Sequence, residues 1–350
     1  MAFVEQRVAV VNAGGWGTAL AVKLANQGHQ VRLWARREEQ AARLQAEREN
    51  RQYLPGVALP PSIRITSDLA MALDGVQTIV VAAIASYLPE ICRLLKPLVP
   101  TDSALIHGTK GLDAASRRRP SEVVRDELGS DMSQDLAVLA GPNHAEEVAR
   151  SLPAAAVIAC ANPERGTKLQ ELFNGPTFRV YTNPDVTGVE LCSAAKNVIA
   201  LAAGIGDGLG YGDNAKAALI TRALAELGRL VQACGGSWST VLGLAGVGDV
   251  VATCTSRHSR NRWAGEQIGR GRSVDEVTSS TSMVVEGIGS ARAIVELARE
   301  AGVEMPICEG VCEVLFDGQS PHEALRALFA REVASELPGR ARQRLEAEGQ

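Results

Sequence analysis

The hydrophobic pattern of this chain changes character close to residue 185. Before that point, short apolar runs alternate with longer stretches of helical periodicity. The runs have the length and composition of buried strands in a parallel sheet that is covered on both faces. They span residues 8–11, 30–35, 78–83, 104–107, 136–140, 154–160 and 178–181. Beyond residue 185 the pattern is helical almost throughout, so the sequence predicts a doubly wound α/β domain over residues 1–185 and an all-α domain over residues 186–350.

One predicted helix, residues 189–203, is nearly all apolar, and Lys196 and Asn197 lie in its middle. A helix that is hydrophobic all round must be buried. Because burial of a lone ammonium is costly, Lys196 must pair with an acid or lose its proton, and either outcome suits general acid–base chemistry. The alternative is that its long side chain reaches the surface.

The chain opens with a strand–turn–helix pattern over residues 7–21. Its turn has the spacing of a G-x-G-x-x-G motif, with Asn12 in place of the first glycine and Gly14 and Gly17 in the other two positions. The unpaired N–H groups of a helix N-terminus favour an anion, and glycines let the backbone approach it closely. We therefore predict a Rossmann-type sheet with a nucleotide site here. The alternative is a glycine-rich turn without a ligand.

The second strand ends in Arg36 and Arg37. At this place a protein specific for NAD usually has a carboxylate for the ribose 2′-hydroxyl, whereas an arginine accommodates the 2′-phosphate of NADP. No acidic residue appears before Glu38 and Glu39, which we assign to the next helix. The sequence therefore favours NADPH over NADH. The alternative is that the two arginines are only a solvated basic pair.

Two further groups of polar residues are candidates for holding a substrate. Lys110 follows the strand 104–107, and the carboxyl end of a parallel strand faces the crevice in which such sheets bind ligands. In the helical part, Ser259, Arg260 and Asn261 are adjacent, and this combination suits a phosphate monoester. The alternatives are a surface lysine in a turn and a solvated loop.

Composition narrows the classes of function. The net charge of −4 gives no reason to expect nucleic acid or an anionic membrane as a partner. The seven cysteines are not spaced as in a disulfide-rich domain, which predicts reduced thiols and a cytoplasmic location. The five histidines are not spaced as metal ligands, so no bound metal is expected. The N-terminus has no signal-peptide pattern, and no apolar run approaches the ~20 residues that span a bilayer. Residues 340–350 are charged and expected to be frayed.

Several separated segments are similar to the bacterial-type NAD(P)-dependent glycerol-3-phosphate dehydrogenases. The similarity covers residues 7–329 and is most specific in GVELCSAAKNVIALAAGI, residues 188–205, and GDVVATCTSRHSRNR, residues 248–262. It implies reduction of dihydroxyacetone phosphate to sn-glycerol 3-phosphate by NADPH or NADH, which supplies glycerophospholipid synthesis. The apolar C-terminal helices allow a homodimer.

The resemblance also implies roles for individual residues. Lys196 is expected to be the general acid–base, Asp249 to orient it, and Lys110 to contact both substrate and cofactor. The expected cofactor contacts are Gly14, Gly15, Trp16, Gly17, Arg36, Lys110, Ala145, Arg260, Val284 and Glu286. The expected substrate contacts are Lys110, Gly141, Asn143, Lys196, Asp249, Ser259, Arg260 and Asn261.

Three positions depart from the pattern of that family: Asn12 replaces a glycine, Gly15 replaces a serine, and His107 stands where small residues are usual. A strained turn at Asn12 would weaken cofactor binding, and each ~1.4 kcal/mol is a factor of ten in affinity. Two alternatives follow. One is the same fold acting on a 3-hydroxy acid or a ketopantoate-like compound, which leaves the cluster at residues 259–261 unexplained. The other is a nucleotide-binding sensor, which leaves the three expected catalytic residues unexplained.

Overall fold

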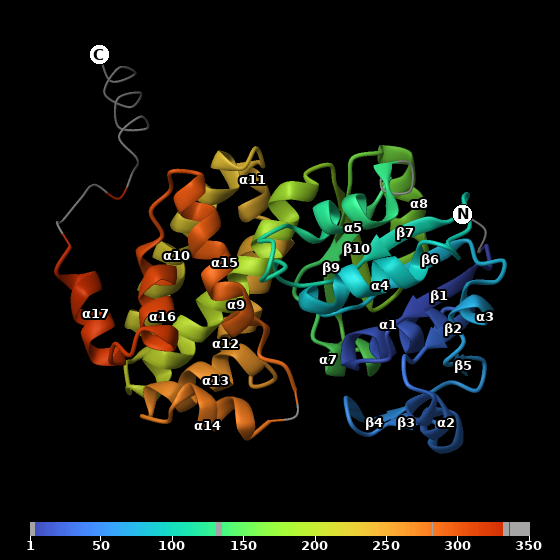
Figure 1. The fold of residues 1–350 in the computed structure, drawn as a ribbon, viewed down its shortest axis with the longest axis horizontal. Helices are drawn as coiled ribbons and strands as arrows, with labels where there is room; N and C mark the ends of the chain where they lie inside the picture. The colour runs from blue at the N-terminus through green and yellow to red at the C-terminus, as the bar shows by residue number, and fades with distance from the viewer. Residues whose placement is uncertain (1–3, 131–134, 282, 332–335, 337–350) are drawn as a thin grey trace, which may run out of the picture.

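The computed structural model describes residues 4–130, 135–281, 283–331 and 336. A sheet with its covering helices forms one side of the molecule, and a bundle of helices forms the other (Figure 1). The last strand, β10 (Phe178–Asn183), is followed directly by the first helix of the bundle, α9 (Val186–Gly208). The predicted class, a Rossmann-type sheet followed by a helical region, is confirmed. The domain boundary at residue 185 stays a prediction, and the fraying expected for residues 340–350 lies outside the described residues.

The sheet has eight strands in the order β10-β9-β8-β7-β6-β1-β2-β5. Their bounds are β1 (Arg7–Val11), β2 (Gln30–Trp34), β5 (Arg64–Thr66), β6 (Thr78–Val81), β7 (Ala104–His107), β8 (Ala137–Ala140) and β9 (Ala154–Cys160), with β10 as given above. All neighbours are parallel except β8 and β9, so β9 and β10 run against the rest. The order from β5 to β8 is that of dinucleotide-binding sheets, which bind their ligand where the order reverses, here between β1 and β6.

Helices cover both faces of this sheet, as the apolar composition of its strands requires. On one face, apolar side chains of α1 (Gly15–Asn26), α7 (Ala145–Ala149) and α8 (Pro163–Phe173) share a buried cluster with the strands. On the other face, α3 (Leu69–Leu73), α4 (Leu88–Leu95) and α5 (Pro120–Leu128) contribute to a second cluster, and the turn η1 (Ala85–Tyr87) directly precedes α4. The fold therefore exposes only the ends of the strands to ligands.

The segment after β2 differs from its prediction. By composition alone, the charged residues 41–50 predict a helix and residues 53–56 and 59–61 mark a loop. In the structure α2 (Glu38–Glu47) ends earlier, and a hairpin of β3 (Glu49–Asn50) and β4 (Leu54–Ala58) follows. The cause is a long-range contact: the buried Asn50 side chain donates hydrogen bonds to Ala13 O at 3.1 Å and to Thr18 Oγ1 at 2.7 Å. The hairpin is thereby fixed to the glycine-rich turn.

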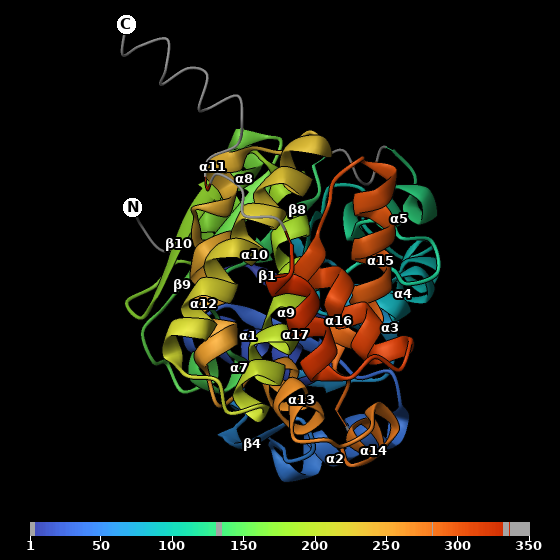
Figure 2. The ribbon, with the colours of Figure 1, turned by 90° about the vertical axis from the view of Figure 1, so that its left-hand side faces the viewer.

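In the helical part, α9 is the central element (Figure 2). Its residues share one apolar core with the helices around it and with Val138, Ala140, Val157 and Ala159 of β8 and β9. The other elements are α10 (Asp213–Ala233), α11 (Trp238–Val241), the π-helical turn η2 (Leu244–Gly248), α12 (Asp249–Thr255), α13 (Arg260–Gly269), α14 (Val274–Ser279), α15 (Glu286–Glu300), α16 (Pro306–Phe316) and α17 (Pro321–Phe329). Because α9 packs on the sheet as well as on the bundle, side chains along it can meet side chains of both parts.

Two helical stretches are, by length and composition alone, long and apolar enough to cross a membrane. They are Val186–Gly208 and Trp238–Thr255, and their apolar windows are 100% and 44% buried inside the protein. The first is the core helix α9, whose apolar surface is covered by its neighbours. Its composition follows from its central position in the bundle.

Candidate active site

A cavity of about 650 Å³ lies between the ends of the strands and the helical bundle. The sheet contributes Gly14, Trp16 and Lys110 to its wall, and the bundle contributes Lys196 and Arg260. The topological switch between β1 and β6 opens into the same space, because the residues that follow both strands line it. Sheet and bundle thus each supply part of one site.

The glycine-rich turn has the geometry that a pyrophosphate requires. Asn12 has a positive φ of 89°, and its carbonyl oxygen would overlap a Cβ atom placed on Gly17. Gly14 caps α1 without any side-chain hydrogen bond, so the first N–H groups of that helix are left to a ligand. A Cβ on Gly15 would lie 2.7 Å from Tyr53 O, which explains why glycine replaces serine here.

The far end of the cavity from the bundle is basic. Arg36 and Arg37 line it, and Arg36 forms an ion pair with Glu90 of α4, with Nη2 2.7 Å from Oε1. Both side chains are about half exposed, so the pair is open to solvent. Glu90 holds the Arg36 guanidinium beside the cavity and also competes with any phosphate for it.

Lys196 and Asp249 form a buried ion pair at the opposite wall. Lys196 Nζ lies 2.6 Å from Asp249 Oδ1 and 3.3 Å from the hydroxyl of Thr253. The two residues are 3% and 2% exposed, so the alternative in which Lys196 reaches the surface is wrong. The turn η2 brings Asp249 to this position, and within the described chain Asp249 Oδ2 has no hydrogen-bond partner. The ammonium is therefore held from behind by a carboxylate that does not itself line the cavity.

Lys110 faces the same cavity from the sheet side. Its ammonium donates to Asn143 Oδ1 at 3.1 Å and lies over the indole ring of Trp16, 5.3 Å from its centroid. Burial lowers the pKa of Lys110 to about 8, and the positive charge of Lys196 adds to the effect. Burial and Lys110 also lower the pKa of His144. Two amines thus share a small volume in which added negative charge would be stabilised.

Ser259, Arg260 and Asn261 are not in a solvated loop but at the start of α13. The Ser259 hydroxyl caps the helix by accepting from Arg262 N at 3.2 Å. Arg260 donates to Val284 O at 3.0 Å, which ties α13 to the segment before α15. Asn261 donates to Asn197 Oδ1 at 2.9 Å. A helix N-terminus with an arginine and an amide has the chemistry that favours a phosphate.

Glu286, at the start of α15, lines the same cavity as Ser259, Arg260 and Asn261. Burial raises its pKa, and the charges of Arg260, Lys110 and Lys196 partly offset the effect. The amide of Asn197 also lowers the pKa of this carboxyl. The carboxyl therefore lies on the border between the basic groups of both parts.

Four buried donor or acceptor atoms in the wall lack a hydrogen-bond partner among the described residues: Trp16 Nε1, Asn143 Nδ2, His144 Nε2 and Asn197 Nδ2. An unpaired buried polar group costs roughly 1–3 kcal/mol, so such atoms mark a place for a polar ligand. Together with the uncapped start of α1, they fit a dinucleotide that extends from the glycine-rich turn toward the bundle. The residues present therefore fit a nicotinamide cofactor.

Most of the predicted site residues line this one cavity. Lys110, Lys196, Gly14, Gly15, Trp16, Arg36, Asn143, Ala145, Ser259, Arg260, Asn261, Val284 and Glu286 do so. The other three lie behind its wall: Gly17 inside the turn, Gly141 at the end of β8 and Asp249 behind Lys196.

Sequence reasoning missed some of the lining. Thr253, Asn197, His144 and Tyr53 contribute to it. Thr253 had a signal, because it stands one helical turn after Asp249 and so shares its face. Tyr53 had none, because the hairpin that carries it was expected to be a loop.

Both parts of the chain match known protein families, and its sequence and fold are similar to those of known proteins. The N-terminus of the NAD-dependent glycerol-3-phosphate dehydrogenases matches residues 7–166, and the C-terminus of the same family matches residues 185–326. Proteins named glycerol-3-phosphate dehydrogenase (NAD(P)+) from Geobacillus thermodenitrificans and Chlorobium phaeobacteroides are 48% and 47% identical. The alignments cover 95% of this chain and 97% and 99% of those proteins. The crystal structure of glycerol-3-phosphate dehydrogenase from Coxiella burnetii has a TM-score of 0.89 and 40% identity, covering 93% of this chain and 99% of that one.

Proposed function

The chain belongs to the NAD-dependent glycerol-3-phosphate dehydrogenase family, and from that membership we propose how its own residues perform the reaction. The protein is an NAD(P)H-dependent oxidoreductase that reduces dihydroxyacetone phosphate to glycerol 3-phosphate, and the resemblance seen in the sequence is thereby confirmed. The observation that supports the mechanism is the buried Lys196–Asp249 pair, whose lysine lines the same cavity as Arg260 and Asn261.

The nucleotide is held along the sheet side of the cavity. We assign its pyrophosphate to the start of α1, where Gly14 and Gly15 allow close approach. Arg36 is assigned to the adenosine ribose and its 2′-phosphate, and Trp16 and Lys110 to the part that approaches the bundle. When bound, NAD(P)H supplies the hydride that the carbonyl carbon accepts. The preference for NADPH rests on Arg36 and is part of the proposal.

The substrate phosphate is assigned to the N-terminus of α13. Arg260 and the first N–H groups of that helix supply positive charge, and Asn261 supplies an amide. An anchor at this end directs the carbonyl of a three-carbon phosphate ester toward the two lysines. Orientation of this kind supplies several kcal/mol of the barrier.

Lys196 is assigned as the proton donor. As the carbonyl carbon gains a hydride, its oxygen gains the proton of the Lys196 ammonium, and in the reverse direction the neutral amine takes that proton back. Asp249 keeps the ammonium oriented through the 2.6 Å contact, and Lys110 stabilises the negative charge that develops on the oxygen. Gly141 and Asp249 act from behind the wall, Gly141 by closing the turn after β8.

One set of assays separates this function from its alternatives. Purified protein is mixed with NADPH and either dihydroxyacetone phosphate, ketopantoate or a 3-oxo acid, and the absorbance of the reduced cofactor is followed. We expect oxidation with the phosphorylated ketone alone. Oxidation with the unphosphorylated acids would favour the second enzyme, and cofactor binding without turnover would favour the sensor.

Three broader assignments accompany the proposal. We place the enzyme in the cytoplasm, because all seven cysteines are free. Its product is the backbone of glycerophospholipids, so we assign it to their synthesis. A homodimer through the apolar C-terminal helices stays a prediction.

A further inference from the structure

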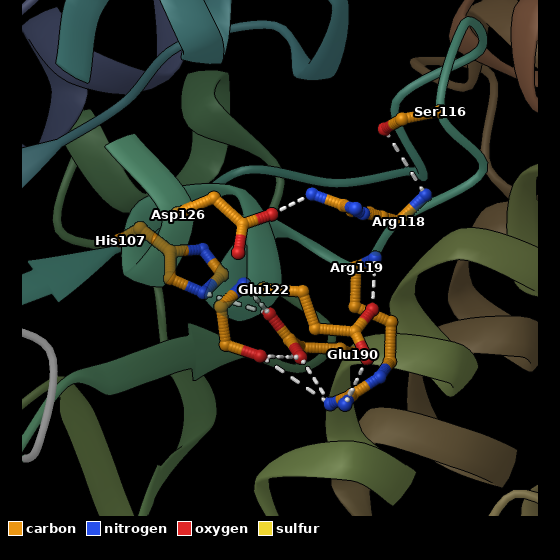
Figure 3. Close-up of polar contacts among 8 residues, drawn as sticks. His107, Ser116, Arg118, Arg119, Glu122, Asp126 and Glu190 are labelled. Atoms are coloured by element: carbon orange, nitrogen blue, oxygen red, sulfur yellow. Dashed lines mark hydrogen bonds and ion pairs between the residues drawn. The ribbon is translucent and has the colours of Figure 1, made fainter. Parts of the chain in front are cut away.

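Glu190 is a buried acid outside the cavity that connects the two parts of the molecule. It stands on α9 six residues before Lys196 and is 2% exposed. Its carboxylate contacts described residues of the sheet side: His107 at the end of β7 and Arg119 at the start of α5 (Figure 3). Ser121, two residues after Arg119, is its third partner. The mechanism above gives it no role.

The contacts of Glu190 are short and occupy both carboxylate oxygens. Oε1 accepts from Ser121 N at 2.6 Å and lies 3.2 Å from His107 Nε2. Oε2 accepts from the Ser121 hydroxyl at 2.6 Å and from Arg119 Nη1 at 2.9 Å. Arg119 is itself held by Glu122 at 2.8 Å, so its guanidinium is fixed on both sides (Figure 3). The cluster of Glu190, His107, Arg119 and Ser121 is called the Glu190 clamp below.

The clamp favours the ionised form of Glu190. Burial opposes ionisation of Glu190, but His107, Arg119 and the Ser121 hydrogen bonds outweigh it and hold the pKa of the carboxyl below its usual value. Removing one partner of a buried charge pair is strongly destabilising, because the remaining charge is left without compensation. The four residues therefore fix the distance between β7, α5 and α9.

Both catalytic lysines are close along the chain to a member of the clamp. His107 is the last residue of β7, and Lys110 follows three residues later. From Glu190 to Lys196, α9 rises by about 9 Å at 1.5 Å per residue, with no interruption of the helix. The clamp thus holds the start of the loop that carries Lys110 and the rigid helix that carries Lys196.

We propose that Glu190 is a positioning residue for the reaction, which sets the placement of Lys196 relative to Lys110 and the nucleotide by locking α9 onto β7 and α5. This inference rests on the proposed role of Lys196. A displacement of about 1 Å at a reacting group costs on the order of a hundredfold in rate, so small shifts of α9 matter. His107, the departure from the family pattern noted in the sequence, belongs to the clamp and not to the cavity wall.

The test is Glu190→Gln, with Asp185→Asn as its matched control. Asp185 also anchors α9 through a carboxylate, which accepts from Gly188 N at 2.8 Å, Ser237 N at 2.8 Å and Thr240 Oγ1 at 2.6 Å. Those contacts all lie within the helical part, so the control weakens the hold on α9 without releasing it from the sheet. Three quantities are measured for each variant: the single-turnover rate of NADPH oxidation, the Kd of NADPH by fluorescence, and the melting temperature.

We expect Glu190→Gln to lose roughly ten- to a hundredfold in single-turnover rate, while the Kd of NADPH changes by less than about twofold. Asp185→Asn should lower the melting temperature at least as much and keep the wild-type rate. A wild-type rate in Glu190→Gln, or equal rate losses in both variants, would overturn the proposal.

A milder variant covers the case in which Glu190→Gln does not fold. Ser121→Ala removes one hydroxyl from the clamp and leaves its charges in place, and we expect a rate loss of roughly threefold or more with unchanged NADPH affinity. An unchanged rate in a folded Ser121→Ala protein would sink the inference. Lys196→Ala, measured alongside, tests the proposed function by itself: if it is inactive while the clamp variants are normal, only the positioning role fails.

Discussion

Lys196 on α9 and Asp249 on α12 face each other at 2.6 Å inside the protein, and only the lysine reaches the cavity. Asp249 has two effects on Lys196. The carboxylate compensates a charge that burial would otherwise neutralise, and it leaves the remaining ammonium protons for the hydroxyl of Thr253 and for a substrate. A proton donor that is held in this way needs no reorganisation when the reaction begins.

Lys196→Ala should abolish turnover and spare the nucleotide site. Because Lys196 lies on the bundle side, we expect a fall in kcat of at least ~100-fold, the usual contribution of a general acid, with little change in the Kd of NADPH. Steady-state oxidation of NADPH and fluorescence titration measure the two quantities. Lys216→Ala is the control, since Lys216 pairs with Asp207 at 2.6 Å outside this cavity and its loss should leave kcat unchanged. Wild-type turnover in Lys196→Ala would remove this residue from the mechanism.

The affinity for dihydroxyacetone phosphate should depend on pH through Lys110. Its pKa is lowered to about 8, so the charged form predominates below that pH and is lost above it. We therefore expect the KM for the anionic substrate to rise as pH increases through about 8. In Lys110→Arg the guanidinium keeps its charge, and the rise between pH 7 and 9 should disappear. A KM that rises in the same way in both proteins would assign the titration to another group.

The lowered pKa of Lys110 also makes the free energy of unfolding depend on pH. The unfolded chain binds a proton at Lys110 up to its ordinary pKa of 10.5, whereas the folded protein releases it near 8. Between these values the unfolded state holds more protons, so this group makes the free energy of unfolding rise with pH in that window. Denaturant titrations of the ligand-free protein at pH 8 and 10, with Lys110→Met as reference, measure the contribution as the difference between the two proteins. A Lys110→Met protein with the same pH dependence as the wild type would contradict it.

Cofactor preference should depend on Arg36 and on its partner Glu90. Arg36→Ala should weaken NADPH binding by about tenfold and NADH binding by less than about twofold, because only NADPH carries the 2′-phosphate. Glu90→Gln removes the competing carboxylate, which lies 2.7 Å from the guanidinium, and should strengthen NADPH binding selectively. Fluorescence titrations with both nucleotides measure the ratios. Arg43→Ala, an exposed change on α2, serves as control, and equal effects on both nucleotides would overturn the assignment.

The layered part of the fold was predictable because its strands are short, apolar runs with a clear length. The run 78–83, for example, corresponds to β6 between two buried neighbours. The hairpin after α2 was not predictable, because Asn50 is placed by hydrogen bonds to residues more than thirty positions away in the sequence. The reversed direction of β9 was equally hidden, because its apolar pattern is the same for either direction.

The site was predictable where a charged residue stands in a segment that must be buried. A lysine in an apolar helix demands a partner, and this pointed to Lys196 without showing that Asp249 supplies it. The Glu190 clamp was not predictable, because the partners of Glu190 lie about 70 positions earlier in the sequence. His107 was noticed only as a departure from the family pattern, and its partner on α9 lies 83 positions later in the sequence.

Asn12→Gly is expected to tighten NADPH binding. Asn12 has φ = 89°, a region that favours glycine, and its side chain lines the cavity beside the turn that receives the pyrophosphate. Relief of strain and the greater entropy of the unfolded glycine oppose each other, so the free energy of unfolding should change by less than about 1 kcal/mol. The freed space should lower the Kd of NADPH by up to about tenfold, whereas Asn12→Ala, which keeps a Cβ in the strained region, should raise it. Fluorescence titration of the three proteins decides the matter, and an unchanged Kd in Asn12→Gly would show that the turn accepts asparagine without loss.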